Sequence, residues 1–442
     1  MQYRLKLAEL AEKQGRPFRI ALVGAGQMGR GFASQSHRLG LQVAVVADIA
    51  PERITQAFHD LGMGDPVISS NVEELNAAIA EGKPAGTTDA AVASNLDVDV
   101  VVEATGVAAI GADVMYHALK AKKHVATLNV EADVTVGPML HRIAKENGVL
   151  YSVCNGDEPA EAKELVDFAK DLSFEVVMAG KGKNNPFEPH SNPDTVAERA
   201  ATKHMNPKML ASFTDGSKTM IEMSALANAT GLKLTKRGML GPQASRTTLQ
   251  DVFRPVSDGG VLQETGVVDY CTGDVAPGVF VVIKTDSPYV AEEMSYLSMG
   301  PGPYFALYRP YHLASVEAPM TIAKMLVDGY ETLTCDRLMT EVIASTKKEH
   351  KAGEIFDGIG GYSARGVADR VEDARAENLV PIGLLQNAVA KRDLPIDHLV
   401  TYDDVELDED ATILSCARCR KSWASRETNG RQARDMRFLP LQ

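Results

Sequence analysis

The 442-residue sequence has little cysteine and no long apolar run, and each shortage excludes a class of protein. Five cysteines in a chain of this length do not suggest a disulfide framework, and no secretory signal precedes the first predicted strand. No apolar segment reaches the length that spans a membrane. We therefore expect a cytoplasmic globular protein with no membrane partner, and its 45% apolar content fits that class.

Positive charge is also in short supply. The chain has 46 basic and 59 acidic residues, which gives a formal net charge of −13. Because nucleic-acid binding relies on a basic surface, this balance argues against a nucleic-acid partner and favours small molecules. Cys416 and Cys419 form a C-x-x-C pair, but a zinc ribbon needs a second pair, which the sequence lacks. No metal ligand set is readable from the sequence.

What the sequence does have is a glycine turn at residues 22–29, which read LVGAGQMG. The apolar segment before it predicts a buried strand, the segment after it predicts a helix ending at Gly40, and a second apolar run ends in Asp48, 19 residues past Gly29. This register predicts a dinucleotide-binding unit, in which the glycines admit the pyrophosphate and the acid holds the adenosine ribose. An ordinary strand-to-helix turn is the alternative. The predicted cofactor residues of this unit are Gly24, Gly26, Gln27, Met28, Gly29, Asp48 and Arg53.

Another predicted strand ends in the segment Glu103-Ala104-Thr105-Gly106. Ligands bind at the carboxyl ends of parallel strands, so this segment is predicted to lie near the nicotinamide ribose. The alternative is that Glu103 is a solvated loop residue. Asp48 favours NAD because a carboxylate repels a 2′-phosphate, and the nearby Arg53 leaves NADP open. The further cofactor residues predicted here are Glu103, Thr105, Gly106 and Asn129.

The character of the sequence changes twice, which predicts three regions. The dinucleotide signals fall in residues 1–155. Residues 156–330 mix predicted helices with strands, as expected of a substrate and catalytic domain. Residues 331–442 show short strands and turns, and their last twenty or so residues are polar and basic, which predicts a flexible tail. The expected fold class is α/β, with a Rossmann-type parallel sheet domain, an α+β catalytic domain and a small β-rich C-terminal domain.

The most informative stretch of the middle region is residues 213–232, a predicted helix. Asp215, Lys218 and Glu222 follow one another at spacings of three and four, so they are predicted to share one helix face. A solvated ladder of ion pairs is the commoner meaning of such a pattern. The alternative is a proton-handling cluster that faces the nicotinamide, with the lysine stabilising a developing alkoxide.

Basic residues gather around the segment AGKGKNNPF, which follows a predicted strand. In an acidic chain this local contrast of charge predicts an anionic small-molecule substrate. Arg309 and His312 are three residues apart in an aromatic, non-helical loop, which makes His312 a catalytic candidate, although a lone histidine is more often structural. Lys181 is a further catalytic candidate, and the predicted substrate ligands are Lys183, Lys203, Lys208 and Arg309.

Several motifs resemble known families. LVGAGQMG, VVAD and VDVVVEATG resemble the NAD(P)-binding domain of the homoserine dehydrogenases. AGKGKNNP, NPKMLASFTDGSKTMIEMSALANATGL and YRPYHLASVEAP resemble the DRL-like oxidoreductases, and AKRDLPIDHLVTYDDVEL is similar to a SAF-type module. The resemblance implies an NAD(P)H-dependent oxidoreductase acting on a CH–OH group. The family's namesake reaction, an isoprenoid precursor step, isomerises and reduces 1-deoxy-D-xylulose 5-phosphate to 2-C-methyl-D-erythritol 4-phosphate with NADPH.

The resemblance also implies site roles. Lys218 or a neighbouring lysine would stabilise the enolate or alkoxide, Asp215 or Glu222 would move the proton, and the loop lysines with Arg309 would hold the anion. Mg²⁺ or Mn²⁺ is an additional candidate cofactor. The second hypothesis is a dehydrogenase of another small hydroxy or carbonyl substrate, similar to homoserine dehydrogenase. The third is a non-catalytic regulator that senses a dinucleotide. Base rates alone favour a homo-oligomer.

Overall fold

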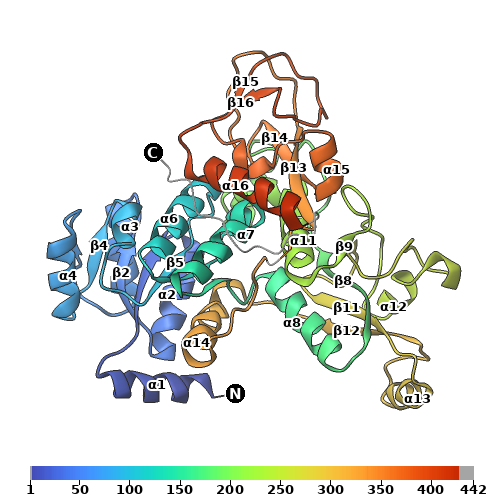
Figure 1. The fold of residues 1–442 in the computed structure, drawn as a ribbon, viewed down its shortest axis with the longest axis horizontal. Coiled ribbons are helices and arrows are strands. Elements are labelled where there is room, and N and C mark those ends of the chain that lie inside the picture. The colour runs from blue at the N-terminus through green and yellow to red at the C-terminus, as the bar shows by residue number, and fades with distance from the viewer. Residues whose placement is uncertain (1, 336, 428–442) are drawn as a thin grey trace.

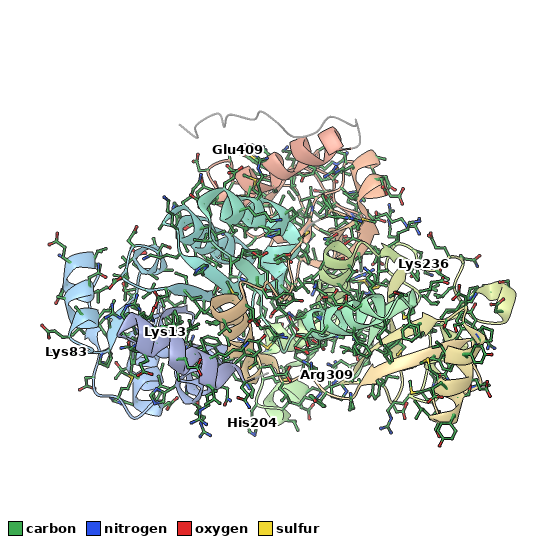
Figure 2. All side chains as sticks on the ribbon, turned by 60° about the horizontal axis from the view of Figure 1, so that its bottom comes forward. Lys13, Lys83, His204, Lys236, Arg309 and Glu409 are labelled. Atoms are coloured by element: carbon green, nitrogen blue, oxygen red, sulfur yellow. The ribbon has the colours of Figure 1, made fainter. Side chains whose placement is uncertain are left out.

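The computed structural model describes residues 2–335 and 337–427, and the side chains of the last helix as far as Cys419. Figure 1 shows a blue and cyan N-terminal domain, a green and yellow middle domain, and an orange and red C-terminal module above the junction of the other two. Figure 2 places Arg309 near that junction, with Lys83 and Lys236 toward opposite ends of the molecule. The tail predicted to be flexible falls largely in residues 428–442, which lie outside the described residues.

The N-terminal domain is built on a seven-stranded parallel sheet in the order β3-β4-β2-β1-β5-β6-β7. Its central strands are fully buried runs of valine, isoleucine and alanine, as expected for a parallel sheet with helices on both faces. The strand order reverses between β1 and β5, which opens a ligand crevice outside the carboxyl ends of these strands. The strands are β1 (Arg19–Val23), β2 (Gln42–Ala47), β3 (Val67–Ile68), β4 (Ala85–Thr87), β5 (Val100–Glu103), β6 (His124–Thr127) and β7 (Tyr151–Val153). The helices are α1 (Tyr3–Gln14), α2 (Gln27–Leu39), α3 (Pro51–Asp60), α4 (Val72–Ala80), α5 (Ala90–Ala93), α6 (Ala108–Lys120) and α7 (Val130–Asn147).

The middle domain has a mixed five-stranded sheet in the order β12-β11-β8-β10-β9. β8 pairs in parallel with β10 and antiparallel with β11, and one face of the sheet is covered by α8 and α11. This mixture is the α+β domain that the sequence predicts. The strands are β8 (Glu175–Lys183), β9 (Lys233–Leu234), β10 (Val267–Thr272), β11 (Val279–Lys284) and β12 (Tyr304–Arg309). The helices are α8 (Glu158–Asp171), α9 (Ala197–Thr202), α10 (Pro207–Thr214), α11 (Ser217–Thr230), α12 (Leu249–Val252), η1 (Val256–Asp258), α13 (Pro288–Tyr296) and η2 (Ala314–Val316).

Helix α14 (Pro319–Asp328) returns to the N-terminal domain, although the predicted boundary at residue 330 assigns it to the middle domain. Its buried Ile322 and Met325 join the apolar cluster that also holds Leu7 of α1 and Phe32 of α2. The hydroxyl of Tyr3 donates a hydrogen bond to Asp328 over 2.6 Å. The chain therefore crosses between the two domains twice, once before α8 and once before α14.

The C-terminal module contains two small antiparallel sheets, β13 with β14 and β15 with β16. Its elements are β13 (Thr340–Thr346), β14 (Ala364–Arg370), α15 (Val371–Ala376), η3 (Ile382–Leu384), β15 (Val389–Ala390), β16 (Val405–Glu406) and α16 (Thr412–Glu427). The predicted three-part α/β fold class is confirmed, and the comparison with a SAF-type module stays a prediction. Within the described residues, no helix is both long and apolar enough to cross a membrane.

Candidate functional site

The turn between β1 and α2 requires glycine at two positions. Gly24 has a φ of +98°, and a Cβ on it would lie 2.8 Å from the backbone of Ala104. A Cβ on Gly29 would lie 1.9 Å from the carbonyl oxygen of Gly24, so the first turn of α2 packs directly on the loop. A Cβ on Gly26, by contrast, would meet nothing within 4 Å. The open space at the start of α2, beside Gln27 and Met28, has the position that a dinucleotide pyrophosphate requires.

We expect Gly29→Ala to lower the stability of the protein and Gly26→Ala to weaken its binding of the cofactor. Gly29→Ala overpacks the turn and should lower the free energy of unfolding by about 1–3 kcal/mol. Gly26→Ala should leave the melting temperature unchanged and weaken NAD(P)H binding about tenfold or more, because its methyl group occupies space beside the helix N-terminus. Thermal unfolding and nicotinamide fluorescence titration measure the two effects. Loss of stability without loss of cofactor affinity in Gly26→Ala would contradict the pyrophosphate site.

Asp48, which is predicted to accept hydrogen bonds from the adenosine ribose, already accepts backbone N–H groups with both of its carboxylate oxygens. Its Oδ2 accepts the Ala25 N–H over 2.8 Å and its Oδ1 accepts the Ala50 N–H over 3.0 Å. The Asp48 side chain is only 6% exposed, whereas Arg53, 3.9 Å from it, is 58% exposed. Arg53 is therefore the more accessible charge beside the predicted ribose position.

The Glu103 side chain also makes internal hydrogen bonds. The side chain is fully buried, so the alternative of a solvated loop residue does not describe it, and the predicted place near the nicotinamide ribose stays a prediction. It accepts hydrogen bonds from the backbone N–H and the hydroxyl of Thr105 and from the hydroxyl of Thr127. Asn129, equally buried, caps α7 through the Ala132 N–H. These residues shape the loop through Gly106 beside the crevice, and Thr105 and Gly106 are left as the surface that a cofactor can reach.

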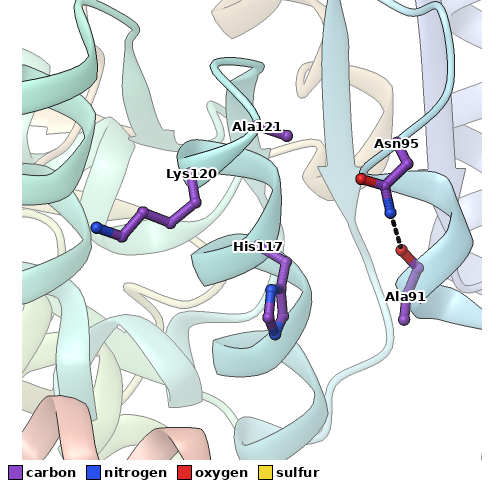
Figure 3. A pocket seen from close by; sticks show the side chains of 5 residues that line it. All are labelled: Ala91, Asn95, His117, Lys120 and Ala121. Carbon is purple, nitrogen blue, oxygen red and sulfur yellow. Dashed lines mark hydrogen bonds between the residues drawn. The ribbon is translucent and has the colours of Figure 1, made fainter. Parts of the chain in front are cut away.

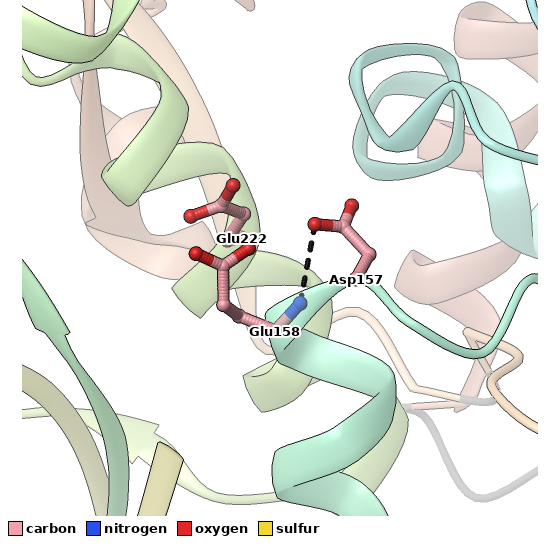
Figure 4. A group of neighbouring side chains, drawn as sticks. All are labelled: Asp157, Glu158 and Glu222. Carbon is pink, nitrogen blue, oxygen red and sulfur yellow. Dashed lines mark hydrogen bonds between the residues drawn. The ribbon is translucent and has the colours of Figure 1, made fainter. Parts of the chain in front are cut away.

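Three carboxylates meet where α8 begins against the middle of α11. We call Asp157, Glu158 and Glu222 the acid trio (Figure 4). One oxygen from each lies within 4.8 Å of the others, and Asp157 also caps α8 by accepting the Glu158 N–H. Of this set, the sequence pattern indicates only Glu222, since Asp157 and Glu158 look like ordinary helix-start acids ahead of Pro159.

 Adjacent acids in the first turn of a helix are common N-terminal signals, so only the fold reveals that they face a third carboxylate.

Two lysines, the buried Lys181 and the partly buried Lys218, face the acid trio. Lys181 Nζ donates to Glu158 Oε1 over 2.7 Å and also contacts Glu222. Lys218 Nζ lies 3.7 Å from Asp157 Oδ2 and 3.8 Å from Glu222 Oε1. It also lies 3.2 Å from Glu131 Oε1, which comes from α7 of the N-terminal domain. Lys218 therefore sits at the junction of the two domains.

The cluster contains more acid than base, and its pKa values reflect this. Burial and the charge of Glu158 raise the pKa of Glu222 to about 8, against the pull of both lysines. Burial also raises the pKa of Asp157 to about 6, although Lys218 opposes the shift. For Lys218, burial works against the charge, but the surrounding carboxylates hold its pKa well above the usual value. Lys218 is thus a fixed cation, suited to stabilising negative charge rather than to accepting a proton.

The donor set of the acid trio fits a divalent cation. Four carboxylates, those of the trio and Glu131, face two ammonium groups, which leaves an excess of two negative charges when all are ionised. Carboxylate oxygens are the ligands that Mg²⁺ and Mn²⁺ prefer. The trio is therefore the candidate metal site within the described residues.

Asp215 does not belong to this cluster, which corrects the prediction that it shares a face with Lys218 and Glu222. Helix α10 ends at Thr214, and Gly216, with a φ of +89°, separates Asp215 from α11. The fully buried Asp215 instead pairs with Lys347 of the C-terminal module over 3.0 Å. Its carboxylate is therefore occupied by internal partners.

The predicted basic cluster is likewise not assembled as one site. Lys183 donates to the carbonyl oxygens of Asn185 and Phe213, and burial, followed by the charge of Lys181, lowers its pKa to about 8. Lys208 donates to the carbonyl oxygen of Asp357 in the C-terminal module. Lys203 is exposed and reaches the Asn185 side chain over 3.4 Å. Lys203 and Lys208 are both exposed, and Lys203 is the one that contacts the Asn185 side chain of the loop that follows β8.

The aromatic loop after β12 connects the acid trio with the glycine turn. His312 Nε2 lies 3.4 Å from Glu158 Oε1, and its Nδ1 lies 2.8 Å from the carbonyl oxygen of Gly156. Further along, η2 packs on α2, where a Cβ on Gly31 would lie 2.5 Å from the Ser315 hydroxyl oxygen. Arg309 is held between Glu161 and Glu317, so it is committed to internal ion pairs rather than open to an anion.

A separate surface hollow lies between α5 and the end of α6 (Figure 3). Its lining residues are Ala91, Asn95, His117, Lys120 and Ala121. Because it adjoins the C-terminal end of α6, it lies at the edge where the parallel strands begin, opposite the carboxyl ends. This hollow is not the candidate active site.

Comparison with protein families identifies both large domains. Residues 24–153 match the family described as homoserine dehydrogenase, NAD binding domain, and residues 156–318 match oxidoreductase DRL, catalytic domain. The chain is therefore an NAD(P)-dependent oxidoreductase. More specifically, the two matches support a DRL-like oxidoreductase, as its sequence motifs predict, and NAD(P) is its cofactor. No match was found among curated proteins.

Solved structures with a similar arrangement share little sequence with this chain. Scyllo-inositol dehydrogenase from Lactobacillus casei, solved with NAD(H) and scyllo-inositol, is 14% identical, with a TM-score of 0.40 over 71% of this chain and 90% of that one. The 1-deoxy-D-xylulose 5-phosphate reductoisomerase from Zymomonas mobilis is 13% identical, with a TM-score of 0.36 over 71% of this chain and 82% of that one.

Proposed function

We propose that this oxidoreductase isomerises and reduces 1-deoxy-D-xylulose 5-phosphate to 2-C-methyl-D-erythritol 4-phosphate with NADPH. The observation that carries the proposal is the acid trio with the two lysines that face it, Lys181 and Lys218, placed where the catalytic domain meets the nucleotide domain. Such a site can hold hydroxyl groups and stabilise oxyanions, which both the rearrangement and the reduction require. The match of residues 156–318 to the DRL catalytic domain supports the same choice.

In the proposed reaction, a carbon–carbon bond of the substrate shifts to give a branched aldehyde, and a hydride from NADPH and one proton then reduce the aldehyde. A divalent cation held by the acid trio would polarise the oxygens of the substrate. Lys218 would stabilise the alkoxide that forms as the hydride arrives. His312, oriented by Gly156, would hold the proton that this alkoxide takes up.

The phosphate of the substrate would bind beside the loop that follows β8. Of the predicted ligands, Lys203 is the best placed, because it is exposed next to Asn185 of this loop. Lys183 and Arg309 already have internal partners, and Lys208, although exposed, bonds to Asp357 of the C-terminal module. An ammonium group on this loop would attract the anion in an otherwise acidic chain.

We expect Arg53→Ala to weaken NADPH binding about tenfold or more and to change NADH binding much less. The reason is that Arg53 is exposed beside the predicted ribose position, where it can pair with the 2′-phosphate of NADPH. Fluorescence titration with each nucleotide gives the two affinities, and Arg38→Ala, at the far end of α2, is the matched control. Equal losses for both nucleotides would refute a phosphate contact.

The test of the proposed function is oxidation of NADPH and NADH in the presence of 1-deoxy-D-xylulose 5-phosphate and Mg²⁺ or Mn²⁺, with identification of the product. Formation of 2-C-methyl-D-erythritol 4-phosphate supports the proposal. No turnover from a protein that still binds the nucleotide would reject this substrate and leave the oxidoreductase family unchanged.

The match to a homoserine dehydrogenase NAD-binding domain favours a second candidate, a dehydrogenase of another small hydroxy or carbonyl compound. Such an enzyme would transfer a hydride without rearranging the carbon skeleton. Product analysis separates the two, because only the reductoisomerase gives a branched product.

A further inference from the structure

The C-terminal module packs on helices from both of the other domains. The ribbon of β13 and β14 lies against α11 of the catalytic domain. On the nucleotide domain, η3 packs against α7, and α16 lies along α6 and α7. A Cβ on Gly383 of η3 would lie 2.1 Å from the Thr135 hydroxyl oxygen of α7, which shows how close this contact is. The module thus bridges the two domains on the side of the acid trio.

A buried chain of polar contacts joins the module to the start of α11. Lys347, just after β13, donates to Asp215 Oδ2 over 3.0 Å and to the Ser191 carbonyl oxygen over 2.7 Å. Asp215 Oδ1 in turn accepts the N–H of Ser217, the first residue of α11, over 2.8 Å. The Lys347 and Asp215 side chains are 1% and 0% exposed, so this pair is shielded from water. The hydroxyl of Ser217 accepts the Gly366 N–H of β14 over 2.8 Å.

A second set of contacts holds the other end of α11. Asn228 Oδ1 accepts the N–H groups of Met339 and Thr340 over 2.8 Å and 2.9 Å. Its Nδ2 donates back to the Thr340 carbonyl oxygen over 3.3 Å. Because both ends of the helix are tied to one ribbon, its rotation and its position along its own axis are fixed by the module.

The helix that is held in this way carries Lys218 and Glu222. Their partners stand on other elements: Asp157 and Glu158 at the start of α8, and Glu131 at the start of α7. The Lys218–Glu131 contact crosses the domain junction, and the module touches both of the helices that make it. A shift of α11 would open this contact and separate Glu222 from the rest of the acid trio.

We propose that the C-terminal module positions the active site, and that Lys347 is the positioning residue that sets α11 in place. Lys347 acts through Asp215 and Ser217 and touches neither cofactor nor substrate. The turnover readout rests on the proposed function, whereas the structural and metal-binding readouts do not.

The experiment compares Lys347→Met with Lys351→Met in the full-length protein. Lys351 belongs to the same module, but its pair with Asp393 is exposed. We expect Lys347→Met to speed amide hydrogen exchange in α11 about tenfold or more, with no change in α2. Mn²⁺ affinity should fall, and kcat should fall about a hundredfold with little change in the KM for NADPH, because a small displacement of catalytic groups is enough for such a loss. Lys351→Met should behave as the wild type.

A second variant guards against misfolding caused by the unpaired Asp215. The double variant Asp215→Asn/Lys347→Met removes both buried charges and is expected to fold, yet to keep the exchange and Mn²⁺ defects. Lys347→Arg should restore part of the function by re-forming the pair. Wild-type exchange in α11 and wild-type Mn²⁺ affinity in both Lys347→Met and the double variant Asp215→Asn/Lys347→Met would overturn the proposal. If the wild type itself does not turn over this substrate, the proposed function fails, while exchange and Mn²⁺ binding still decide the role of Lys347.

Discussion

Replacing Lys218 with methionine is expected to lower kcat by about 10²–10³ while NAD(P)H binding is retained. Methionine keeps most of the apolar stem and removes the cation that faces Glu131, Asp157 and Glu222. Burial would normally disfavour a charged lysine, but these carboxylates raise the pKa of Lys218 far enough to keep it charged across the working pH range. The variant therefore removes a fixed positive charge from the position where the alkoxide is proposed to form.

The matched control for this prediction is Lys233→Met, just beyond the end of α11. Lys233 forms an exposed ion pair with Glu264 over 2.8 Å, and such pairs contribute little. Steady-state kinetics should show unchanged kcat in the control, and nicotinamide fluorescence should show intact cofactor binding in both variants. A Lys218→Met enzyme that keeps about a third or more of the wild-type kcat would contradict the role of this cation.

The glycine turn could be predicted because its determinants are local. Gly24 and Gly29 are required by the backbone within one strand–turn–helix unit, and their spacing is visible in the sequence. The roles of the nearby acids were harder to predict. A sequence pattern places Asp48 and Glu103 near the crevice, but it does not reveal that their oxygens are already occupied by backbone and hydroxyl donors.

The candidate site can be predicted from the sequence only in part, and Gly216 is the first reason. Periodicity alone puts Asp215 on the face of Lys218 and Glu222, but the left-handed Gly216 ends that periodicity before α11 begins. The pair Lys218–Glu222 lies within the helix, and there the spacing predicts the contact correctly. Asp157, Glu158 and Glu131 come from two other helices, so their convergence depends on tertiary structure that local spacing does not encode.

The sequence is equally limited in predicting which basic residues are available to a ligand. Net charge makes Lys183, Lys203 and Lys208 conspicuous in an acidic chain, but a lysine can be satisfied by carbonyl oxygens, which leave no charge signal in the sequence. A sequence can therefore predict that lysines are concentrated in a segment. Which of them remains available to a ligand depends on the backbone that folds around each ammonium group.

Glu222→Gln is expected to stabilise the protein without divalent cations and to abolish its response to them. Because burial and Glu158 raise the pKa of Glu222 to about 8, its stabilising effect on the fold is complete below the unfolded value of 4.5 and is lost as the pH rises through 8. Glutamine is not ionised, so it escapes this loss. The stability advantage of Glu222→Gln should therefore grow between about pH 4.5 and 8 and stay constant above that range.

A divalent cation should stabilise the wild type more than it stabilises Glu222→Gln. Cation binding requires the ionised form of Glu222, so Mn²⁺ should raise the melting temperature of the wild type more at pH 8.5 than at pH 6, by about 2 °C or more at saturation. Glu222→Gln has lost one of three carboxylates and should show little response, and its kcat should fall by about 10² or more.

Thermal unfolding with EDTA and with Mn²⁺, across this pH range, measures both effects. Glu292→Gln on the exposed face of α13 is the control, and it should follow the wild type in every condition. A wild-type protein whose stability ignores Mn²⁺ at pH 8.5 would show that the acid trio does not bind a divalent cation. If Glu222→Gln is instead less stable than the wild type at high pH, the carboxylate is ionised there and favourably paired with Lys181 and Lys218, so the excess of negative charge does not govern this site.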